Sequence, residues 1–340
     1  MRQPAFRRLL VTGGAGFIGS HFVRLVLDQG VPEVVVLDKL TYAGSLRNLE
    51  GVLEHPRLRF LQGDIADPAA VAEAVAGCDA VVNFAAETHV DRSLLEPAAF
   101  VRTNVWGTMV LLEQALRAGV RRFLHVSTDE VYGEVLAGAA RETDPLRPRN
   151  PYAASKAAAE HFAFAYRESY QLPVLVTRGC NTYGPYQHPE KFIPLAITNL
   201  LSGQPVPIYG DGLQERDWLY VEDHCRAVWT VLLYGNPGEA YNIGTGQHRP
   251  NLEVARRLVA LLDADPSLIV HVTDRPGHDR RYAVDWSKLA ALGWAPQVSF
   301  DEGLARTVAW YRSRVDWWSA RRDETFAEYY ARNYRNRAAP

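Results

Sequence analysis

The chain has 340 residues, of which 47% are hydrophobic and 22% are charged, and its formal net charge is −2. This near-balanced charge excludes a strong electrostatic preference for nucleic acid or for an acidic membrane surface. No apolar run approaches the roughly 20 residues that cross a bilayer, and the N-terminal sequence lacks the pattern of a signal peptide. Cys78, Cys180 and Cys225 lie far apart in sequence and predict neither a disulfide framework nor a metal site. We therefore expect a cytoplasmic protein with no metal, no nucleic-acid partner and no membrane partner.

The first 180 residues alternate between two hydrophobic patterns. Short apolar, β-branched runs predict strands at 9–12, 34–38, 59–64, 80–85, 123–127 and 174–178. Segments of helical period lie between several of them. In one, apolar residues recur from Val101 to Leu116, and Gly119 follows where a left-handed residue ends a helix. Buried strands alternating with amphipathic helices are typical of a parallel sheet covered on both faces, so we predict a doubly wound, Rossmann-like α/β fold.

Beyond about residue 180 the alternation breaks, and proline and glycine become frequent. A seventh strand at 241–244 could return to the sheet, and the region from Asn251 onward has a mixed pattern. This predicts a smaller C-terminal substrate lobe interleaved with the sheet domain. We assign residues 1–180 and about 220–250 to the dinucleotide-binding domain, and about 181–219 and 251–335 to the substrate lobe.

A glycine-rich loop follows the first strand directly, with the sequence Gly13-Gly14-Ala15-Gly16-Phe17-Ile18-Gly19. The GxxGxxG spacing lets backbone amides at a helix N-terminus face a pyrophosphate, although a tight turn without a ligand can use the same glycines. The second strand ends at Asp38, where a carboxylate can hold ribose hydroxyls, and no arginine follows at once to favour a 2′-phosphate. NAD is therefore predicted over NADP. Asp64, at the end of the third strand, could contact adenine or cap the strand end.

A second group of polar residues predicts acid–base chemistry. Ser127-Thr128-Asp129-Glu130 ends a buried strand, and Tyr152 and Lys156 lie near the start of a helix behind Asn150-Pro151. The i, i+4 spacing puts Tyr152 and Lys156 on one helical face. An ammonium stabilises a phenolate, so we expect Lys156 to lower the pKa of Tyr152 and make it a base near neutrality. The same two residues could form an ordinary surface pair on another helix.

With its GxxGxxG loop, strand-end Ser/Thr and YxxxK motif, the sequence resembles the extended short-chain dehydrogenase/reductase superfamily. That resemblance leaves epimerases, decarboxylases, reductases and dehydratases open. Dehydration needs a base for the C5 proton of the sugar and an acid for the departing C6 oxygen, which Asp129 and Glu130 could supply together. A hexose 4-epimerase needs only oxidation and reduction at C4. The carboxyl pair therefore favours a dehydratase.

Over nearly the whole chain, the sequence resembles the dTDP-glucose 4,6-dehydratases. The segments that carry the resemblance are 85–93, 127–133, 183–186, 189–191, 210–223, 241–244 and 274–278. The resemblance implies an NAD-dependent lyase in which Tyr152 takes the 4-hydroxyl proton while hydride passes from C4 to NAD. Glu130 would then remove the C5 proton, Asp129 would protonate the leaving C6 hydroxyl, and hydride would return to C6. The product would be the 4-keto-6-deoxy sugar, with NAD retained.

The resemblance also implies the residues of the site. The catalytic residues would be Thr128, Asp129, Glu130, Tyr152 and Lys156. The NAD contacts would be Gly13, Gly16, Phe17, Ile18, Gly19, Asp38, Lys39, Thr41, Asp64, Ile65, Ala85, Ala86, Thr103, Ser127, Tyr152, Lys156 and Thr182. The nucleotide-sugar contacts would be Glu87, His89, Thr128, Asn181, Lys191, Phe192, Pro207, Tyr209, Arg216, Asn251, Asp274, Arg275, His278 and Tyr334. Arg216 and Arg275 suit a diphosphate because a guanidinium bonds phosphate oxygens bidentately, although surface ion pairs are common for arginine.

One segment departs from the family pattern. Before Tyr183 the family usually has Arg-Cys-Ser-Asn-Asn, whereas this chain has Arg178-Gly179-Cys180-Asn181-Thr182. The substrate-facing asparagine is kept as Asn181, but Thr182 replaces an asparagine that usually touches the nicotinamide end. Threonine can still donate one hydrogen bond, with a shorter reach.

The family also implies a homodimer packed through the helices near 100–118 and 152–169, whose apolar stripes could equally be core faces. Several functions stay open on the sequence alone. They are the same reaction on UDP- or CDP-glucose, another nucleotide-sugar epimerase or decarboxylase, and a non-catalytic NAD-binding scaffold. The presence of Asp129, Glu130, Tyr152 and Lys156 together argues against the scaffold.

Overall fold

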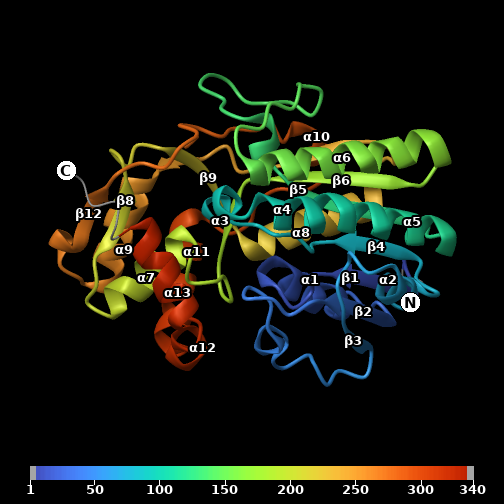
Figure 1. The fold of residues 1–340 in the computed structure, drawn as a ribbon, viewed down its shortest axis with the longest axis horizontal. Helices are drawn as coiled ribbons and strands as arrows, with labels where there is room; N and C mark the ends of the chain where they lie inside the picture. Colours follow the sequence, from blue (N-terminus) through green and yellow to red (C-terminus); the bar gives the residue numbers. More distant parts are fainter. Residues whose placement is uncertain (1–4, 335–340) are drawn as a thin grey trace.

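A seven-stranded parallel sheet forms the centre of the computed structural model, which describes residues 5–334 (Figure 1). Its strands are β1 (Arg8–Thr12), β2 (Glu33–Asp38), β3 (Leu58–Gln62), β4 (Ala80–Asn83), β5 (Arg122–Thr128), β6 (Val174–Gly179) and β10 (Ala240–Ile243). They run in the order β10-β6-β5-β4-β1-β2-β3, and every pairing is parallel. All seven predicted strands are confirmed, including the late return of β10. The chain order reverses between β1 and β4, the place where such sheets bind ligands beyond the carboxyl ends of their strands.

Helices cover both faces of this sheet, because successive strand residues point to opposite sides. Leu9 and Val11 of β1 join the core beneath α1 (Phe17–Asp28) and α8 (Val221–Tyr234), whereas Leu10 joins the core of the other face. That second face is covered by α2 (Pro68–Val75), α5 (Thr108–Ala118) and α6 (Pro151–Tyr170). The doubly wound α/β prediction is therefore confirmed.

The helix predicted from Val101 onward differs from a regular α-helix. It begins with α4 (Pro97–Phe100), continues as a π-helix η2 (Val101–Gly107) and becomes α5, which ends at Gly119 with φ 66° as predicted. Gly107 packs against Ile65, so closely that a Cβ there would lie 2.7 Å from Ile65 Cγ1. The Asn104 side chain is also drawn inward by hydrogen bonds to both backbone groups of Glu87, at 2.8 and 3.0 Å. Such wider turns are frequent at functional sites.

The remaining elements build the second lobe, at the left of Figure 1. Its strands form two small sheets, β11-β9-β7 and β12-β8. They are β7 (Asn181–Tyr183), β8 (Val206–Tyr209), β9 (Glu215–Tyr220), β11 (His248–Pro250) and β12 (Ile269–Val272). Its helices are α7 (Phe192–Leu201), α9 (Asn251–Leu262), α11 (Phe300–Ser313), α12 (Val315–Ser319) and α13 (Glu324–Asn333). The intervening α8 and β10 pack on α1 and β6, in keeping with the interleaving, but the domain boundaries themselves stay a prediction.

Short helices complete the connections. They are η1 (Leu46–Leu49), α3 (Val90–Leu95), η3 (Asp129–Tyr132), η4 (Pro266–Leu268) and α10 (Ser287–Ala290). Within residues 5–334, none of the helices has the length and apolar character required to cross a bilayer.

Candidate active site

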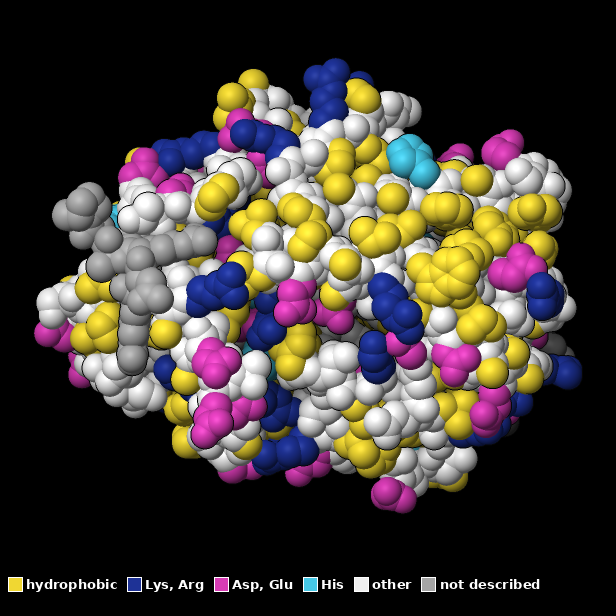
Figure 2. Space-filling view, viewed as in Figure 1, with side chains coloured by type: hydrophobic (Ala, Val, Ile, Leu, Met, Phe, Trp, Pro, Cys, Tyr) yellow, Lys and Arg dark blue, Asp and Glu magenta, His cyan; other side chains and the backbone are white. Residues whose placement is uncertain are grey.

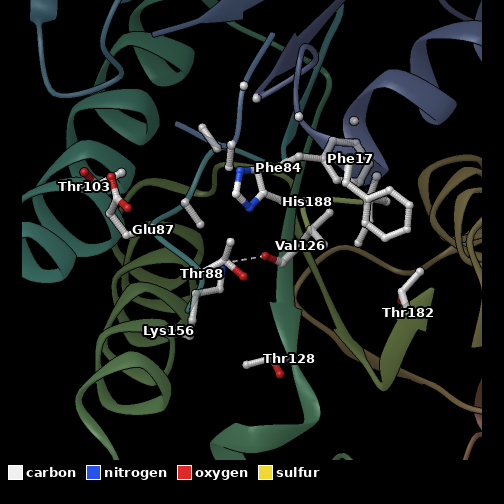
Figure 3. Close-up of a pocket in the computed structure, with 18 of the residues that line it drawn as sticks. Phe17, Phe84, Glu87, Thr88, Thr103, Val126, Thr128, Lys156, Thr182 and His188 are labelled. Carbon is white, nitrogen blue, oxygen red and sulfur yellow. Dashed lines mark hydrogen bonds between the residues drawn. The ribbon is translucent and has the colours of Figure 1, made fainter. Parts of the chain in front are cut away.

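A pocket lies at the carboxyl ends of β1, β4 and β5, beside the point where the strand order reverses (Figure 3). Every residue predicted to contact NAD lines it, as do all five predicted catalytic residues. Of the predicted sugar-nucleotide residues, Glu87, Thr128, Asn181 and Lys191 line the same pocket. The others lie outside its lining, and they are His89, Phe192, Pro207, Tyr209, Arg216, Asn251, Asp274, Arg275, His278 and Tyr334. The fold thus brings together predicted site residues from Gly13 to Lys191, which lie far apart in the sequence.

The glycine loop can approach a ligand closely because four of its positions have no side chain. Gly13 has φ 67°, and a Cβ there would come within 2.6 Å of the Ala85 amide nitrogen. A Cβ on Gly19 would lie 2.2 Å from the Gly13 carbonyl oxygen. Gly16 is the N-cap of α1 and brings no side chain to the helix end. The N-terminus of a 12-residue helix therefore faces the pocket with its backbone amides, which fits a pyrophosphate.

Two carboxylates stand where the ribose and the adenine of a dinucleotide are expected. Asp38 is fixed by two backbone amides, from Ala15 at 2.9 Å and Leu40 at 2.8 Å, and burial raises its pKa. Asp64 accepts a hydrogen bond from the Ala66 amide at 2.9 Å and pairs with Lys39 at 2.8 Å. Asp64 thus caps the strand end and lines the pocket as well. The glycine loop, the helix end and Asp38 together fit NAD.

Tyr152 and Lys156 reach the pocket from the first turns of α6, on one face of the helix as predicted. The Lys156 ammonium donates a hydrogen bond of 2.7 Å to the Val126 carbonyl of β5, drawn as a dashed line in Figure 3. Both side chains are buried. The lysine is therefore held by the strand below it.

The expected effect of Lys156 on Tyr152 is not found in this structure. Burial raises the pKa of the Tyr152 hydroxyl, the charge of Glu130 raises it further, and the Thr88 and Thr128 hydroxyls act in the opposite direction. Burial also lowers the pKa of Lys156 to about 8. In this structure burial of the phenol therefore outweighs the Lys156 ammonium, which is bonded to a carbonyl, and the lowering of the Tyr152 pKa stays a prediction.

The adjacent carboxyls at the end of β5 have different environments. Asp129 is 3% exposed, and burial, followed by the charge of Glu130, raises its pKa well above the usual range. One of its oxygens, Oδ2, has no hydrogen-bond partner among the described residues, and the other accepts from Thr128 at 3.3 Å. Glu130 is only half-buried. A carboxyl kept protonated next to a more exposed one provides an acid and a base at one site.

Three residues that sequence reasoning missed contact the catalytic groups. The Asn150 amide, which caps α6, and the Tyr282 hydroxyl each lie 3.4 Å from Glu130 Oε2. Thr88 lies beside the Tyr152 hydroxyl. Asn150 could have been found as the cap before Pro151, and Thr88 from its place next to Glu87. Tyr282 has no signal in the sequence, because only the fold brings it to Glu130.

Some of the predicted sugar-nucleotide residues outside the pocket lining contact one another, such as Tyr209 with His278 and Tyr334. Arg216 is 4% exposed and, within residues 5–334, bonds only backbone carbonyls, those of Glu215 at 2.8 Å and Asp279 at 2.9 Å among them. Its guanidinium lies 4.3 Å from the ring centre of Tyr282. Arg275, in contrast, is paired with the buried Asp91 at 3.2 Å. In the described part of the chain Arg216 is thus a buried cation without a carboxylate partner, which favours an anionic ligand.

Thr182, which replaces the asparagine usual in the family, contacts His224 in this structure. The Thr182 hydroxyl lies 2.6 Å from His224 Nδ1 and 3.2 Å from the Cys180 carbonyl, so its one donor proton has a partner within the protein. A Cβ at Gly179 would come within 2.5 Å of the His224 ring. Gly179 and Thr182 thus fit around one buried imidazole, whose pKa burial lowers to about 4.

The chain is similar over most of its length to enzymes of known reaction. The family model described as GDP-mannose 4,6 dehydratase matches residues 10–307. A dTDP-glucose 4,6-dehydratase of Streptomyces niveus is 52% identical over 317 residues, covering 92% of this chain and 94% of that enzyme. The solved dTDP-glucose 4,6-dehydratase of Streptomyces venezuelae, which has NAD bound, is 53% identical with a TM-score of 0.91, covering 92% of this chain and 99% of that one.

The same fold occurs in an epimerase with a different reaction. UDP-glucose 4-epimerase of Thermus thermophilus, solved with NAD, is 36% identical with a TM-score of 0.84, covering 90% of this chain and 99% of that one. The overall fold therefore does not separate the two activities, whereas the higher identity to the dehydratases does. The chain belongs to the dTDP-glucose 4,6-dehydratase family, whose members are NAD-dependent hydro-lyases.

Proposed function

We propose that this protein converts dTDP-glucose to dTDP-4-keto-6-deoxyglucose and water. The observation that carries the proposal is the pair Asp129 and Glu130, one carboxyl buried and the other half-buried, at the edge of a pocket that fits NAD. An epimerase has no use for such a pair, since it removes and returns hydrogen at C4 alone. Oxidation at C4 and reduction at C6 cancel, so the net change is the loss of one water.

The residues of the pocket divide the proton transfers among them. Bound NAD supplies the redox chemistry by accepting a hydride from C4 and returning one to C6, and its positively charged ring favours the phenolate of Tyr152. Tyr152 takes the proton of the 4-hydroxyl, helped by the neighbouring Thr88 and Thr128 hydroxyls. Glu130 removes the C5 proton, which the C4 ketone has made acidic, and gives it back to C5 as hydride reaches C6. Asp129 gives its proton to the C6 oxygen as water leaves, in keeping with the raised pKa of this buried carboxyl.

The nucleotide diphosphate would lie across the second lobe. Arg216, buried and without a carboxylate partner among residues 5–334, is placed to bond the phosphates bidentately. Lys191 donates to the Thr88 carbonyl and lines the catalytic pocket, between the sugar and the phosphates in this arrangement. The preference for dTDP over UDP or CDP rests on the relatives, among them the Streptomyces niveus enzyme.

Mass spectrometry of dTDP-, UDP- and CDP-glucose after incubation with the protein and catalytic NAD tests this function. We expect loss of one water from dTDP-glucose without net reduction of NAD. Water loss from UDP- or CDP-glucose in place of dTDP-glucose would change the proposed substrate and leave the proposed reaction unchanged. An unchanged mass with a chromatographic shift would indicate an epimerase, and no change in any sugar would indicate an NAD-binding scaffold.

We also propose a homodimer formed through η2, α5 and α6. Four large hydrophobic side chains on η2 and α6 are exposed, namely Val101 (57%), Trp106 (50%), Phe162 (42%) and Tyr170 (56%). Figure 2 shows hydrophobic side chains gathered over this face of the molecule. An exposed apolar patch of this kind is typical of a protein–protein interface, and a second copy of the chain is the partner that the family implies.

A further inference from the structure

Both backbone groups of one residue in the glycine loop, Ala15, are held by contacts that come from outside the loop. Ala15 donates its amide to Asp38 Oδ2 at 2.9 Å. Its carbonyl accepts two hydrogen bonds, from the Asn48 side chain at 2.8 Å and from the Ser45 amide at 3.0 Å. Asn48 lies in η1 and is fully buried. The same residue of the loop therefore touches the ribose-binding carboxylate on one side and a buried amide on the other.

The Asn48 amide is in turn oriented by the C-terminal part of the chain. Trp317 of α12 donates its indole N–H to Asn48 Oδ1 at 3.1 Å, and Arg321 contacts the same oxygen at 3.4 Å. An indole nitrogen can only donate and a carbonyl can only accept, so the amide has one consistent orientation, with its nitrogen toward Ala15. Trp317 and Asn48 are 269 residues apart in sequence.

The position of the Trp317 side chain is fixed by tight packing. Its side chain is fully buried among aromatic rings, with centres 5.0 Å away for Trp310 and 5.9 Å for Tyr186. The Arg321 guanidinium lies 3.7 Å from the ring centre of Trp317 and donates to its carbonyl at 2.7 Å. The Trp317 side chain therefore has little freedom to move. It can hold the Asn48 side chain in one position.

We propose that Asn48 and Trp317 are positioning residues for NAD, which hold the backbone of Ala15 so that the loop amides and Asp38 keep their binding geometry. No residue of α12 lines the pocket, yet this helix of the second lobe then contributes to cofactor affinity through Asn48. The proposal rests on the proposed function only in taking NAD as the cofactor. It does not depend on the sugar or on the reaction.

The chain offers a matched control for the test. Trp318, the next residue of α12, is also buried and also donates its indole N–H to an acceptor, the Tyr311 carbonyl at 2.9 Å. That bond leads to α11, away from the glycine loop. Trp317→Phe and Trp318→Phe thus remove the same indole N–H donor from the same helix. Only Trp317→Phe should change the affinity for NAD.

The affinity of each protein for NAD should be measured by equilibrium dialysis without sugar, together with its melting temperature. We expect Trp317→Phe to raise the Kd for NAD about tenfold, in the range for loss of one buried hydrogen bond, and Trp318→Phe to change it by less than about twofold. Both variants should lose comparable thermal stability. At saturating NAD, Trp317→Phe should keep the kcat and the KM for dTDP-glucose of the parent.

Equal NAD affinity in the two tryptophan variants would overturn the proposal. If Trp317→Phe does not fold, Asn48→Asp tests the same link, because it keeps the size and the acceptor for Trp317 and replaces the donor to Ala15 by an oxygen. Asn48→Asp should weaken NAD binding more than Trp317→Phe does, and unchanged binding would refute the link. A parent protein that binds NAD but does not dehydrate dTDP-glucose would contradict the proposed function alone.

Discussion

Replacing Asp129 by asparagine should separate catalysis from stability. A protonated carboxyl and an amide have nearly the same size and both bring a donor to this buried position, so Asp129→Asn should fold as the parent does. The amide cannot release a proton to the C6 oxygen. We therefore expect turnover to fall by about 10²–10⁴-fold, the usual contribution of a general acid.

The same substitution should stabilise the folded protein at neutral pH. Burial raises the pKa of Asp129 in the folded state above its value in the unfolded chain, so the unfolded state alone gains by ionising the group. Below about pH 4 both states are protonated and the group has no effect on stability. As the pH rises above that value, the parent should lose stability relative to Asp129→Asn by about 1.4 kcal/mol per pH unit, until the folded pKa is reached.

Two measurements check this reasoning. Turnover of dTDP-glucose is followed by mass spectrometry, and urea unfolding of the parent and Asp129→Asn is followed between about pH 4 and pH 8, the range above the ordinary aspartate pKa. The stability difference should be near zero at the acid end and should grow in favour of the variant with pH. Turnover within a few-fold of the parent would remove Asp129 from the role of acid, and a difference that is constant with pH would show that Asp129 is ionised in the folded protein.

Three further substitutions test the other assignments. Glu130→Gln should slow product formation by about 10²–10⁴-fold while the Kd for NAD stays unchanged in dialysis, and normal turnover would contradict its role as base. Tyr152→Phe should prevent the first oxidation, so the absorbance of reduced nicotinamide should never appear when sugar is added in a stopped-flow experiment; even a transient signal would exclude Tyr152 as the base. Trp106→Glu places a charge in the exposed apolar face and should give a monomer in analytical ultracentrifugation, whereas an unchanged dimer would place the interface elsewhere.

The sequence predicts most of the sheet because the information is local. Each central strand is a short apolar run, and the turn after β1 needs glycines at Gly13 and Gly19, where any Cβ would collide with backbone. The identity of the cofactor follows for the same reason, since Asp38 lies at the end of β2, one strand away from the glycine loop. The spacing of Tyr152 and Lys156 likewise fixes their common helical face.

Tertiary structure alone decides the electrostatics of the site and its distant contacts. The sequence places a cation next to Tyr152, but only burial shows that the phenol is harder to ionise and that the Lys156 ammonium is bonded to Val126. Burial also separates Asp129 from Glu130, two neighbours that look equivalent in the sequence. The π-helical turns of η2 and the contact of Trp317 with Asn48 have no local signal, because they depend on close packing against segments far away in the chain. The residue pattern thus determines which elements form and which groups are available, and packing determines the charge and orientation of those groups, since both depend on what surrounds each side chain in three dimensions.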